Sequence, residues 1–200
     1  MMFVKFIQFI MRVLILFMWF FSLPLAGQTI KNLVFEGGGM RGVSYAGALM
    51  ELEKQGFLDS IQNIGGTSVG AIAAMMLAIG YSPDEIEKEI AEANPRKFND
   101  GTVLFFGGST RLRKHFGWYK GKKVSRWIGG LIDKKLETDE ITFAQLNQAG
   151  RPALYVTGTS LNNQRVIVFS HESYPDMKVR DAVRASMSIP FFFKPVIIDS

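Results

Sequence analysis

Residues 64–80, IGGTSVGAIAAMMLAIG, decide the fold, because they join an apolar approach, a tight glycine turn and a run of small apolar residues. The approach, at about Ile61–Ile64, predicts a short strand, and Val69–Ile79 predicts a helix that carries almost no polar side chain. A helix that is apolar on every side is a buried one. A strand, a turn and a buried helix in this order are typical of an α/β protein with a parallel sheet.

The segments around this stretch continue the alternation of strands and helices. Asn32–Phe35 predicts a strand, and Val43–Gln55 predicts a helix that Gly56 ends. Ser82 followed by Pro83 and Glu85 predicts a capped helix that runs to about Ala93. Further along we expect a helix at Val124–Lys135, a hairpin of strands at 153–161 and 165–172, a helix at 176–188 and an extended segment at 189–199. The fold class is therefore α/β, with a central, mostly parallel sheet and helices on both of its faces.

The first 28 residues have the pattern of a secretory signal peptide. Lys5 and Arg12 precede an apolar run from Val13 to Leu25, and the small pair Ala26-Gly27 follows it. The apolar run is shorter than the roughly 20 residues that a membrane-spanning helix needs, so a retained anchor is the weaker alternative. We therefore expect an exported protein with one domain at residues 30–200.

Composition narrows the function classes. Without residues 1–28 the formal net charge falls from +5 to +3 (5 − 2), which suits weak attraction to an anionic membrane surface and does not by itself indicate nucleic acid. The chain has no cysteine, so a disulfide, a cysteine zinc site and a thiol nucleophile are excluded. No cofactor is expected, and no cluster of His, Asp and Glu at ligand spacing indicates a metal.

The turn Gly66-Thr67-Ser68-Val69-Gly70 matches the Gly-x-Ser-x-Gly pattern of a nucleophile elbow. Such a turn is so sharp that the serine adopts a strained backbone and its neighbours two positions away must lack side chains. The pattern predicts Ser68 as a nucleophile whose hydroxyl projects above the sheet. The amide of Val69 and the positive end of the next helix would stabilise a negative charge there. The motif is weak on its own, and a plain strand-to-helix turn is the alternative interpretation.

A second glycine turn lies between the first expected strand and the first expected helix. It consists of Gly37, Gly38, Gly39, Met40, Arg41 and Gly42. Three successive glycines let backbone amides approach a ligand with no Cβ in the way, and Arg41 brings one charged side chain to the same region. Together with the Val69 amide, this loop predicts an oxyanion hole.

The same loop also fits the dinucleotide-binding fingerprint Gly-x-Gly-x-x-Gly. That fingerprint expects an acidic residue about 20 positions later, at the end of the second strand, and Asp59 has this separation. Asp59 precedes the second expected strand, however, whose far end leads into Gly-Gly-Thr-Ser. Dinucleotide binding is therefore the weaker interpretation.

Three blocks in this order, VFEGGGMRGVSYAGAL (34–49), IGGTSVGAIAA (64–74) and AVRASMSIPFFFKPVIID (182–199), resemble the patatin-like phospholipase family. The likeness covers most of the chain, from about Asn32 to Asp199. It implies a three-layer α/β fold and a serine acyl hydrolase of lipid esters whose catalytic dyad is serine and aspartate. By position, it implies Ser68 as the nucleophile and the Gly37–Gly42 loop as the oxyanion hole, with Arg41 matching a basic residue that the family often carries there.

A serine hydroxyl needs a positioned group that accepts its proton. His115 lies in a basic stretch and His171 follows a strand, and neither context indicates catalysis. The pair Asp100-Gly101 comes too early for the family's Asp-Gly-Gly or Asp-Gly-Ala turn and is interpreted as a plain turn. Asp199 matches the acidic residue that often closes the strand before that turn. We therefore expect the catalytic aspartate beyond residue 200, and an incomplete, largely inactive copy of the domain in residues 30–200.

The stretch RLRKHFGWYKGKKVSRW interleaves cations with aromatic residues, which suits contact with anionic lipid headgroups. Its members are Arg111, Arg113, Lys114, Phe116, Trp118, Tyr119, Lys120, Lys122 and Lys123. A solvated loop with a few buried aromatics is an equal alternative, and binding of single-stranded nucleic acid is a distant one. The sequence as a whole favours a phospholipase A type lipid acyl hydrolase at a membrane surface, with a non-catalytic binding or scaffold relative as the second reading.

Overall fold

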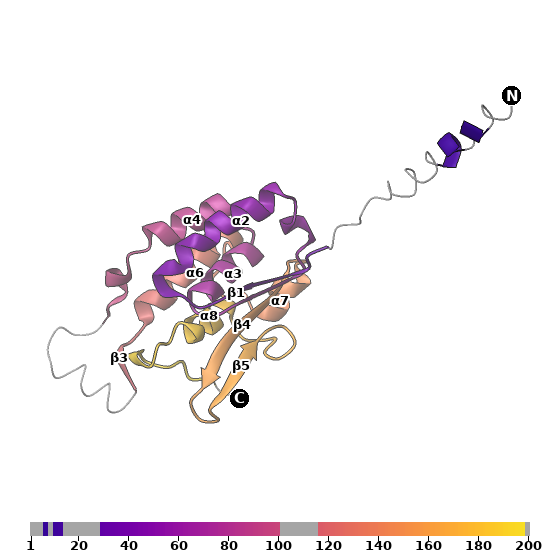
Figure 1. Cartoon of the computed structure of the whole chain (residues 1–200). Helices are drawn as coiled ribbons and strands as arrows, with labels where there is room; N and C mark the ends of the chain where they lie inside the picture. Colours follow the sequence, from indigo (N-terminus) through magenta and orange to yellow (C-terminus); the bar gives the residue numbers. More distant parts are fainter. Residues whose placement is uncertain (1–5, 8–9, 14–28, 101–115, 199–200) are drawn as a thin grey trace.

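The computed structural model describes residues 6–7, 10–13, 29–100 and 116–198 (Figure 1). Its main sheet has four strands in the order β1-β2-β4-β5, which are Asn32–Phe35, Asn63–Gly66, Ala153–Ser160 and Arg165–Phe169. The first three strands are parallel, and β5 returns antiparallel to β4 as the second arm of a hairpin. The predicted α/β class, with a mostly parallel sheet flanked by helices, is confirmed.

Helix α3 (Val69–Ala78) is the centre of the core. Every residue of α3 except Leu77 is buried, as the sequence of small and apolar residues predicts. The helix contacts β1, β2 and β4, and with α8 (Val179–Ser186) it covers one face of the sheet. Small side chains allow this close approach between helix and strands, so the end of β2 is fixed against the start of α3.

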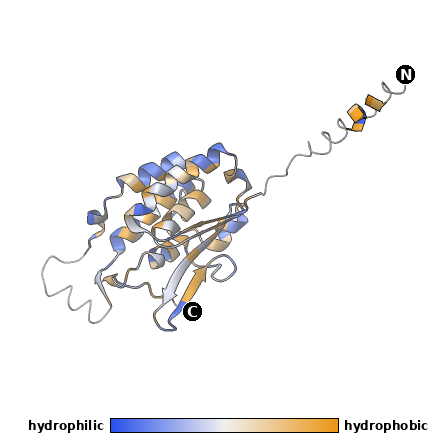
Figure 2. Cartoon of the chain, in the orientation of Figure 1, coloured by the Kyte–Doolittle hydropathy of each residue, from blue (hydrophilic) through white to orange (hydrophobic). Residues whose placement is uncertain are grey.

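Further helices pack outside α3 on the same side of the sheet. These are α2 (Ser44–Lys54), α4 (Pro83–Glu92) and α6 (Lys122–Leu136), while the short α7 (Phe143–Gln148) contacts β4. In Figure 2 the outer helices alternate hydrophilic and hydrophobic residues, as helices with one solvated face do. Among the described residues, no helix is both long enough and apolar enough to cross a membrane.

The opposite face of the four-stranded sheet is open within the described part of the chain. Alternate residues on β1 and β5 point to this face, and Val34, Val166 and Val168 are exposed there. Leu33, Phe35, Ile167 and Phe169 point the other way, toward the helices. The two faces of one sheet therefore differ sharply in burial.

A second, two-stranded parallel sheet joins β3 (Gly117–Tyr119) to β6 (Phe191–Phe193). The sequence predicts one extended segment over 189–199, but among the described residues of that segment only the three residues of β6 form a strand. They pair with β3 instead of the main sheet. The prolines at 190 and 195 explain the short strand, because a proline cannot donate to a ladder. The sequence offers no such signal for β3, which was not predicted.

Most other predicted elements are confirmed with small shifts. Strand β2 begins two residues later than expected and extends through Gly65 and Gly66, because both glycines pair with β1 and β4. The predicted first helix is α2, preceded by a 3₁₀ turn at Gly39–Val43. Helix α7 was not predicted, although Thr142 and Gln145 form a capping box that a search for Thr-x-x-Gln would find.

Candidate active site

The two glycine turns meet at one edge of the sheet. Strands β1 and β2 are parallel neighbours in register, with Phe35 opposite Gly66, so the turns that follow them leave from the same edge. A Cβ built on Gly37 would lie 3.5 Å from the Cβ of Ser68. The Gly37–Gly42 loop is therefore in contact distance of the predicted nucleophile, and Ser68 is only half-buried.

The backbone of Ser68 adopts a conformation that L-residues rarely occupy. Its φ is 56° and its ψ is −122°, directly before the first residue of α3. Such a backbone costs about 1–3 kcal/mol and persists only where the surrounding structure imposes it. The strain is the one that a nucleophile elbow requires.

Three glycines are imposed by packing around this turn. A side chain on Gly66 would collide with the backbone of Gly70, and one on Gly70 would collide with the carbonyl groups of Phe35 and Glu36. A side chain on Gly42 would collide with Val69, which joins the second turn to the elbow. These contacts explain why the motif needs glycine on both sides of Ser68.

Several backbone amides of the two glycine turns have no hydrogen-bond partner in the described part of the chain. Among the described residues, no hydrogen bond uses the amide of Gly38, of Gly39 or of Val69. Gly39 has a φ of +56°, which glycine adopts without cost. Met40 and Arg41 are exposed, and the Nε of Arg41 would lie 3.5 Å from a Cβ on Gly38. The loop that lies beside Ser68 through Gly37 thus carries two unbonded amides and one exposed cation.

Helix α8 supplies a contact that the sequence did not reveal. The amide of Ser68 donates a 2.8 Å hydrogen bond to the Oγ of Ser186, the last residue of α8. The neighbouring Thr67 shares a 2.6 Å hydroxyl-hydroxyl hydrogen bond with Thr157 on β4. These bonds hold the elbow from both sides. Only tertiary structure could show them, because Ser186 lies 118 residues from Ser68.

No described acid or imidazole contacts the Ser68 hydroxyl. His171 packs its ring edge-on against Tyr155 at 6.3 Å, and its Nε2 faces Glu172. It makes no hydrogen bond with Ser68 among the described residues. His115 and Asp199 lie outside the described residues, as do Arg111, Arg113 and Lys114. Asp59 lies in a 3₁₀ turn before β2, at the end of the strand opposite to the glycine loop, so it does not face the loop as a dinucleotide site would require.

Asp100 has a structural role. Its carboxylate accepts hydrogen bonds from the amides of Gly121, Lys122 and Lys123 at the start of α6. Burial alone would raise the pKa of Asp100, but these amides outweigh burial and hold its pKa below the usual value. Asp100 therefore caps the N-terminus of α6, although it lies about 20 residues before that helix. The sequence predicted only a plain turn at Asp100-Gly101.

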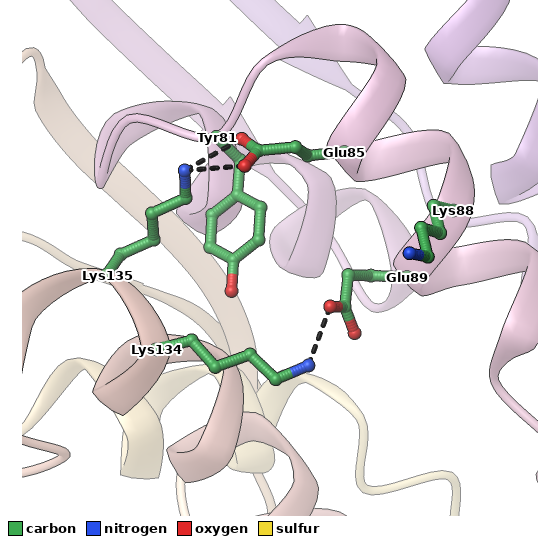
Figure 3. Close-up of a pocket in the computed structure, with 6 residues that line it drawn as sticks. All are labelled: Tyr81, Glu85, Lys88, Glu89, Lys134 and Lys135. Atoms are coloured by element: carbon green, nitrogen blue, oxygen red, sulfur yellow. Dashed lines mark hydrogen bonds and ion pairs between the residues drawn. The ribbon is translucent and has the colours of Figure 1, made fainter.

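A pocket of about 240 Å³ lies between α4 and α6 (Figure 3). None of the residues that line it belongs to either glycine turn. Lys135 pairs with Glu85 and Lys134 with Glu89, while the Tyr81 hydroxyl donates to the carbonyl of Leu131. Burial first, and then the two glutamates, raise the pKa of Tyr81 to about 12. The tyrosine stays protonated, and two lysines of α6 are paired with two glutamates of α4, so the contacts in this pocket join two helices.

Comparison with known proteins decides the family. A family model described as patatin-like phospholipase matches residues 33–200. The chain belongs to the patatin-like phospholipase family. Its Gly37–Gly42 and Gly66–Gly70 turns both fall inside the matched region.

Several relatives are similar to this patatin-like chain over most of its length. Uncharacterized protein R571 of Acanthamoeba polyphaga mimivirus is 38% identical over 85% of this chain and 55% of its own length. Uncharacterized protein YqhO of Bacillus subtilis (strain 168) is 34% identical, over 82% of this chain and 57% of its own. A protein named probable lipid hydrolase 463L, of Invertebrate iridescent virus 6, is 27% identical over 88% of this chain and 59% of its own length. The patatin-like chain thus spans little more than half the length of these relatives.

Solved structures share the fold of this patatin-like chain. Full-length ExoU of Pseudomonas aeruginosa, in complex with SpcU, superposes with a TM-score of 0.61 at 24% identity, over 81% of this chain and 39% of ExoU. VipD of Legionella pneumophila gives a TM-score of 0.61 at 19% identity, over 83% of this chain and 43% of VipD. At these identities the likeness concerns the fold alone.

Proposed function

We propose that the protein is a serine acyl hydrolase of lipid esters, of phospholipase A type, with Ser68 as its nucleophile. The observation that carries this proposal is the strained backbone of Ser68 at the start of α3, with Gly37 of the second glycine turn beside it. Membership of the patatin-like phospholipase family and a relative named probable lipid hydrolase support lipid esters as the substrate class.

The proposed reaction follows from the geometry of the two turns. The Ser68 Oγ attacks the ester carbonyl, and the carbonyl oxygen becomes an oxyanion as the new carbon-oxygen bond forms. Amides of Gly38, Gly39 and Val69 would donate to that oxyanion, at the positive end of α3. The base that accepts the Ser68 proton passes it to the leaving oxygen, so collapse of the intermediate expels the alcohol and leaves an acyl-enzyme. Water, deprotonated by the same base, then attacks the acyl carbonyl, which releases the acid and regenerates Ser68.

The proposed base is an aspartate outside the printed sequence, as the family resemblance implies. A carboxylate can accept the Ser68 proton if it is desolvated and bonded to the hydroxyl, because burial raises its pKa toward the working range. A longer sequence of this protein should then contain Asp-Gly-Gly or Asp-Gly-Ala shortly after Ser200. A longer sequence without that turn would contradict the dyad.

Reaction with a fluorophosphonate probe tests the nucleophile. In a version of the protein that includes the proposed aspartate, we expect covalent labelling of wild type and none of Ser68→Ala. Ser125→Ala, a half-buried serine of α6, is the matched control and should label as wild type does. Labelling of Ser68→Ala at the wild-type rate would exclude Ser68. Absence of labelling in every variant would favour the second candidate, a non-catalytic patatin-like binding or scaffold protein.

We further propose that the substrate is presented at a membrane surface after export of the protein. The apolar run before Ala26-Gly27 supports removal of residues 1–28 as a signal peptide. The intact mass of protein from the exported fraction tests this proposal, and we expect the mass of a chain lacking that segment. A chain that keeps residues 1–28 and stays in the membrane fraction would favour the alternative, an N-terminal anchor.

A further inference from the structure

The sheet formed by β3 and β6 carries a cluster of exposed, large apolar side chains. Phe116 is 59% exposed, Ile189 58%, Phe191 67% and Phe192 43%. We call these four residues the β6 patch. Single exposed apolar residues are common on protein surfaces, whereas a contiguous group marks an interaction site.

Backbone hydrogen bonds link the four residues of the β6 patch, because Phe191 donates to Phe116 and Phe192 donates to Ile189. The amide of Phe191 donates a 3.0 Å hydrogen bond to the carbonyl of Phe116, and Phe191 is paired with Gly117 in the sheet. The ring of Phe192 packs edge-on against Tyr119 of β3 at 4.8 Å. Residues that lie more than 70 positions apart in the sequence are therefore held side by side.

A buried arginine fixes the patch to the body of the protein. Arg184 of α8 is 4% exposed and donates to the carbonyls of Gly121 at 3.1 Å and Lys194 at 3.0 Å, which flank β3 and β6. Its guanidinium also lies 5.0 Å from the centre of the Phe193 ring. Arg184 therefore ties the ends of both strands to α8, with Phe193 buried and with Phe191 and Phe192 exposed.

The surroundings of the β6 patch are cationic. Lys120, Lys122 and Lys123, between β3 and the first turn of α6, are exposed, and the Nζ of Lys123 also donates a 3.0 Å hydrogen bond to the carbonyl of Asn99. Residues 116–132 and 182–198 contain no aspartate or glutamate. Asp100, which reaches this region from elsewhere, accepts from the α6 amides. Apolar side chains bordered by lysines suit the boundary between acyl chains and anionic headgroups.

The β6 patch also begins close to the predicted nucleophile. Ser186, whose Oγ accepts the Ser68 amide, lies three residues before Ile189 in the chain. The segment from the elbow to the patch is therefore short and tied at both ends, by Ser186 and by Arg184.

We propose that the β6 patch docks the protein on an anionic lipid bilayer, with its apolar side chains below the headgroups and the three lysines on the phosphates. This proposal deepens the proposed function, since it names the surface through which a lipid ester would reach Ser68. The four apolar residues make the main contact with the bilayer, and the lysines favour anionic bilayers over neutral ones. The docking itself needs no catalysis.

The absence of cysteine from the whole chain allows a local test. A single cysteine at Phe191 is labelled with the environment-sensitive fluorophore NBD and mixed with vesicles of phosphatidylglycerol and phosphatidylcholine. The matched control is a labelled cysteine at Val166, which is 71% exposed on the open face of the main sheet. We expect a blue shift and brighter emission for the label at 191, and no change at 166. A local probe is needed because the apolar N-terminal segment could itself bind vesicles in every variant.

Three results would overturn the proposal. The first is an unchanged spectrum at 191, and the second is an equal response at 166. The third is a response at 191 that depends on protein concentration without vesicles, which would assign the patch to self-association. An equal response with vesicles of phosphatidylcholine alone would overturn the assignment of an anionic surface.

A second measurement isolates the lysines. Replacing Lys120, Lys122 and Lys123 with glutamine in the chain labelled at 191 should weaken vesicle affinity by about fivefold for each lysine removed. Lys54→Gln and Lys88→Gln, on α2 and α4, form the control and should leave the affinity unchanged. The experiments are repeated in Ser68→Ala, where the docking response should persist. A failure of Ser68 labelling with fluorophosphonate would then remove the proposed function and leave the docking proposal standing.

Discussion

The N-termini of α3 and α6 differ in whether a protein group accepts hydrogen bonds from their first backbone amides. At α6, the carboxylate of Asp100 accepts three amide hydrogen bonds, at distances of 2.6 to 3.2 Å. At α3, no hydrogen bond among the described residues uses the first amide, that of Val69. Both ends carry the positive end of a helix dipole.

This difference separates a structural helix end from one suited to a ligand. An amide that is capped by the protein cannot bind an oxyanion, whereas an uncapped amide beside a half-buried serine can. At the α3 end, Gly66 and Gly70 leave no room for a side chain because the atoms around them belong to the backbone, whereas the glycine at the start of α6, Gly121, packs against the Arg184 side chain. The chain uses close packing at α3 and a charged cap at α6 to hold two similar helix ends.

The largest expected effect comes from a substitution that disrupts the packing at the N-terminus of α3. Gly70→Ala should lower the free energy of unfolding by about 3 kcal/mol, because the new methyl group collides with backbone carbonyls that cannot move aside. Urea denaturation measures the change. Gly65→Ala is the control, since its Cβ would meet neighbours only at 3.6 Å and beyond, and it should stay within about 0.5 kcal/mol of wild type. Equal losses in the two variants would contradict the packing argument.

The second prediction tests access to the uncapped end of α3. Gly38 has an extended φ of −160° and would accept a Cβ at ordinary contact distances, so Gly38→Ala should fold normally. Its methyl group would crowd the amides beside Ser68, and fluorophosphonate labelling should slow by about tenfold to a hundredfold. Gly47→Ala, at an exposed position of α2, should leave the rate unchanged and stabilise the helix by about 1 kcal/mol. Wild-type labelling of Gly38→Ala would remove this loop from the oxyanion hole.

The third prediction concerns the support of the elbow by α8. Ser186→Ala removes the acceptor of the Ser68 amide and should cost about 1 kcal/mol of stability. Labelling of Ser68 should slow as well, because the elbow loses a constraint on its strained backbone. Ser186→Thr keeps an oxygen at this position and should restore both quantities. Stability restored without the labelling rate would show that Ser186 does not position Ser68.

The smallest expected effect concerns the capped end at α6. The pKa of Asp100 is lowered in the folded protein, so its charge stabilises the fold at pH values above the ordinary aspartate pKa of about 3.9. That stability is lost as the pH falls through the lowered pKa. Asp100→Asn should therefore cost about 0.5 kcal/mol at pH 7 and nothing at low pH.

Thermal unfolding of both proteins from pH 7 to pH 2 measures this difference. Asp84→Asn is the matched control, because Ser82 and Glu85 already cap α4 and the loss of charge there should matter less. A difference between wild type and Asp100→Asn that stays constant with pH would show that the charge of Asp100 does not stabilise α6.

The elbow and the buried helix could be predicted from the sequence because each depends on local chemistry. Glycine at 66 and 70 and the small residues after Ser68 allow only a sharp turn into a buried helix, and the capping box at Ser82 places the next helix start. Strand β3 and the pairing of β6 could not be predicted. Both strands have three residues, and their pairing depends on contacts between distant segments.

The sequence by itself determined the α/β class, the turn that strains Ser68 and the glycine loop that precedes it, because backbone sterics act between near neighbours. Tertiary structure alone decided that the two turns share one edge of the sheet, that Ser186 holds the elbow and that Asp100 caps α6. It also gathered Phe116 and Phe191 into one exposed surface beside the lysines. Hydrogen bonds and packing between distant residues form only when strands pair and helices dock, and no local pattern encodes them.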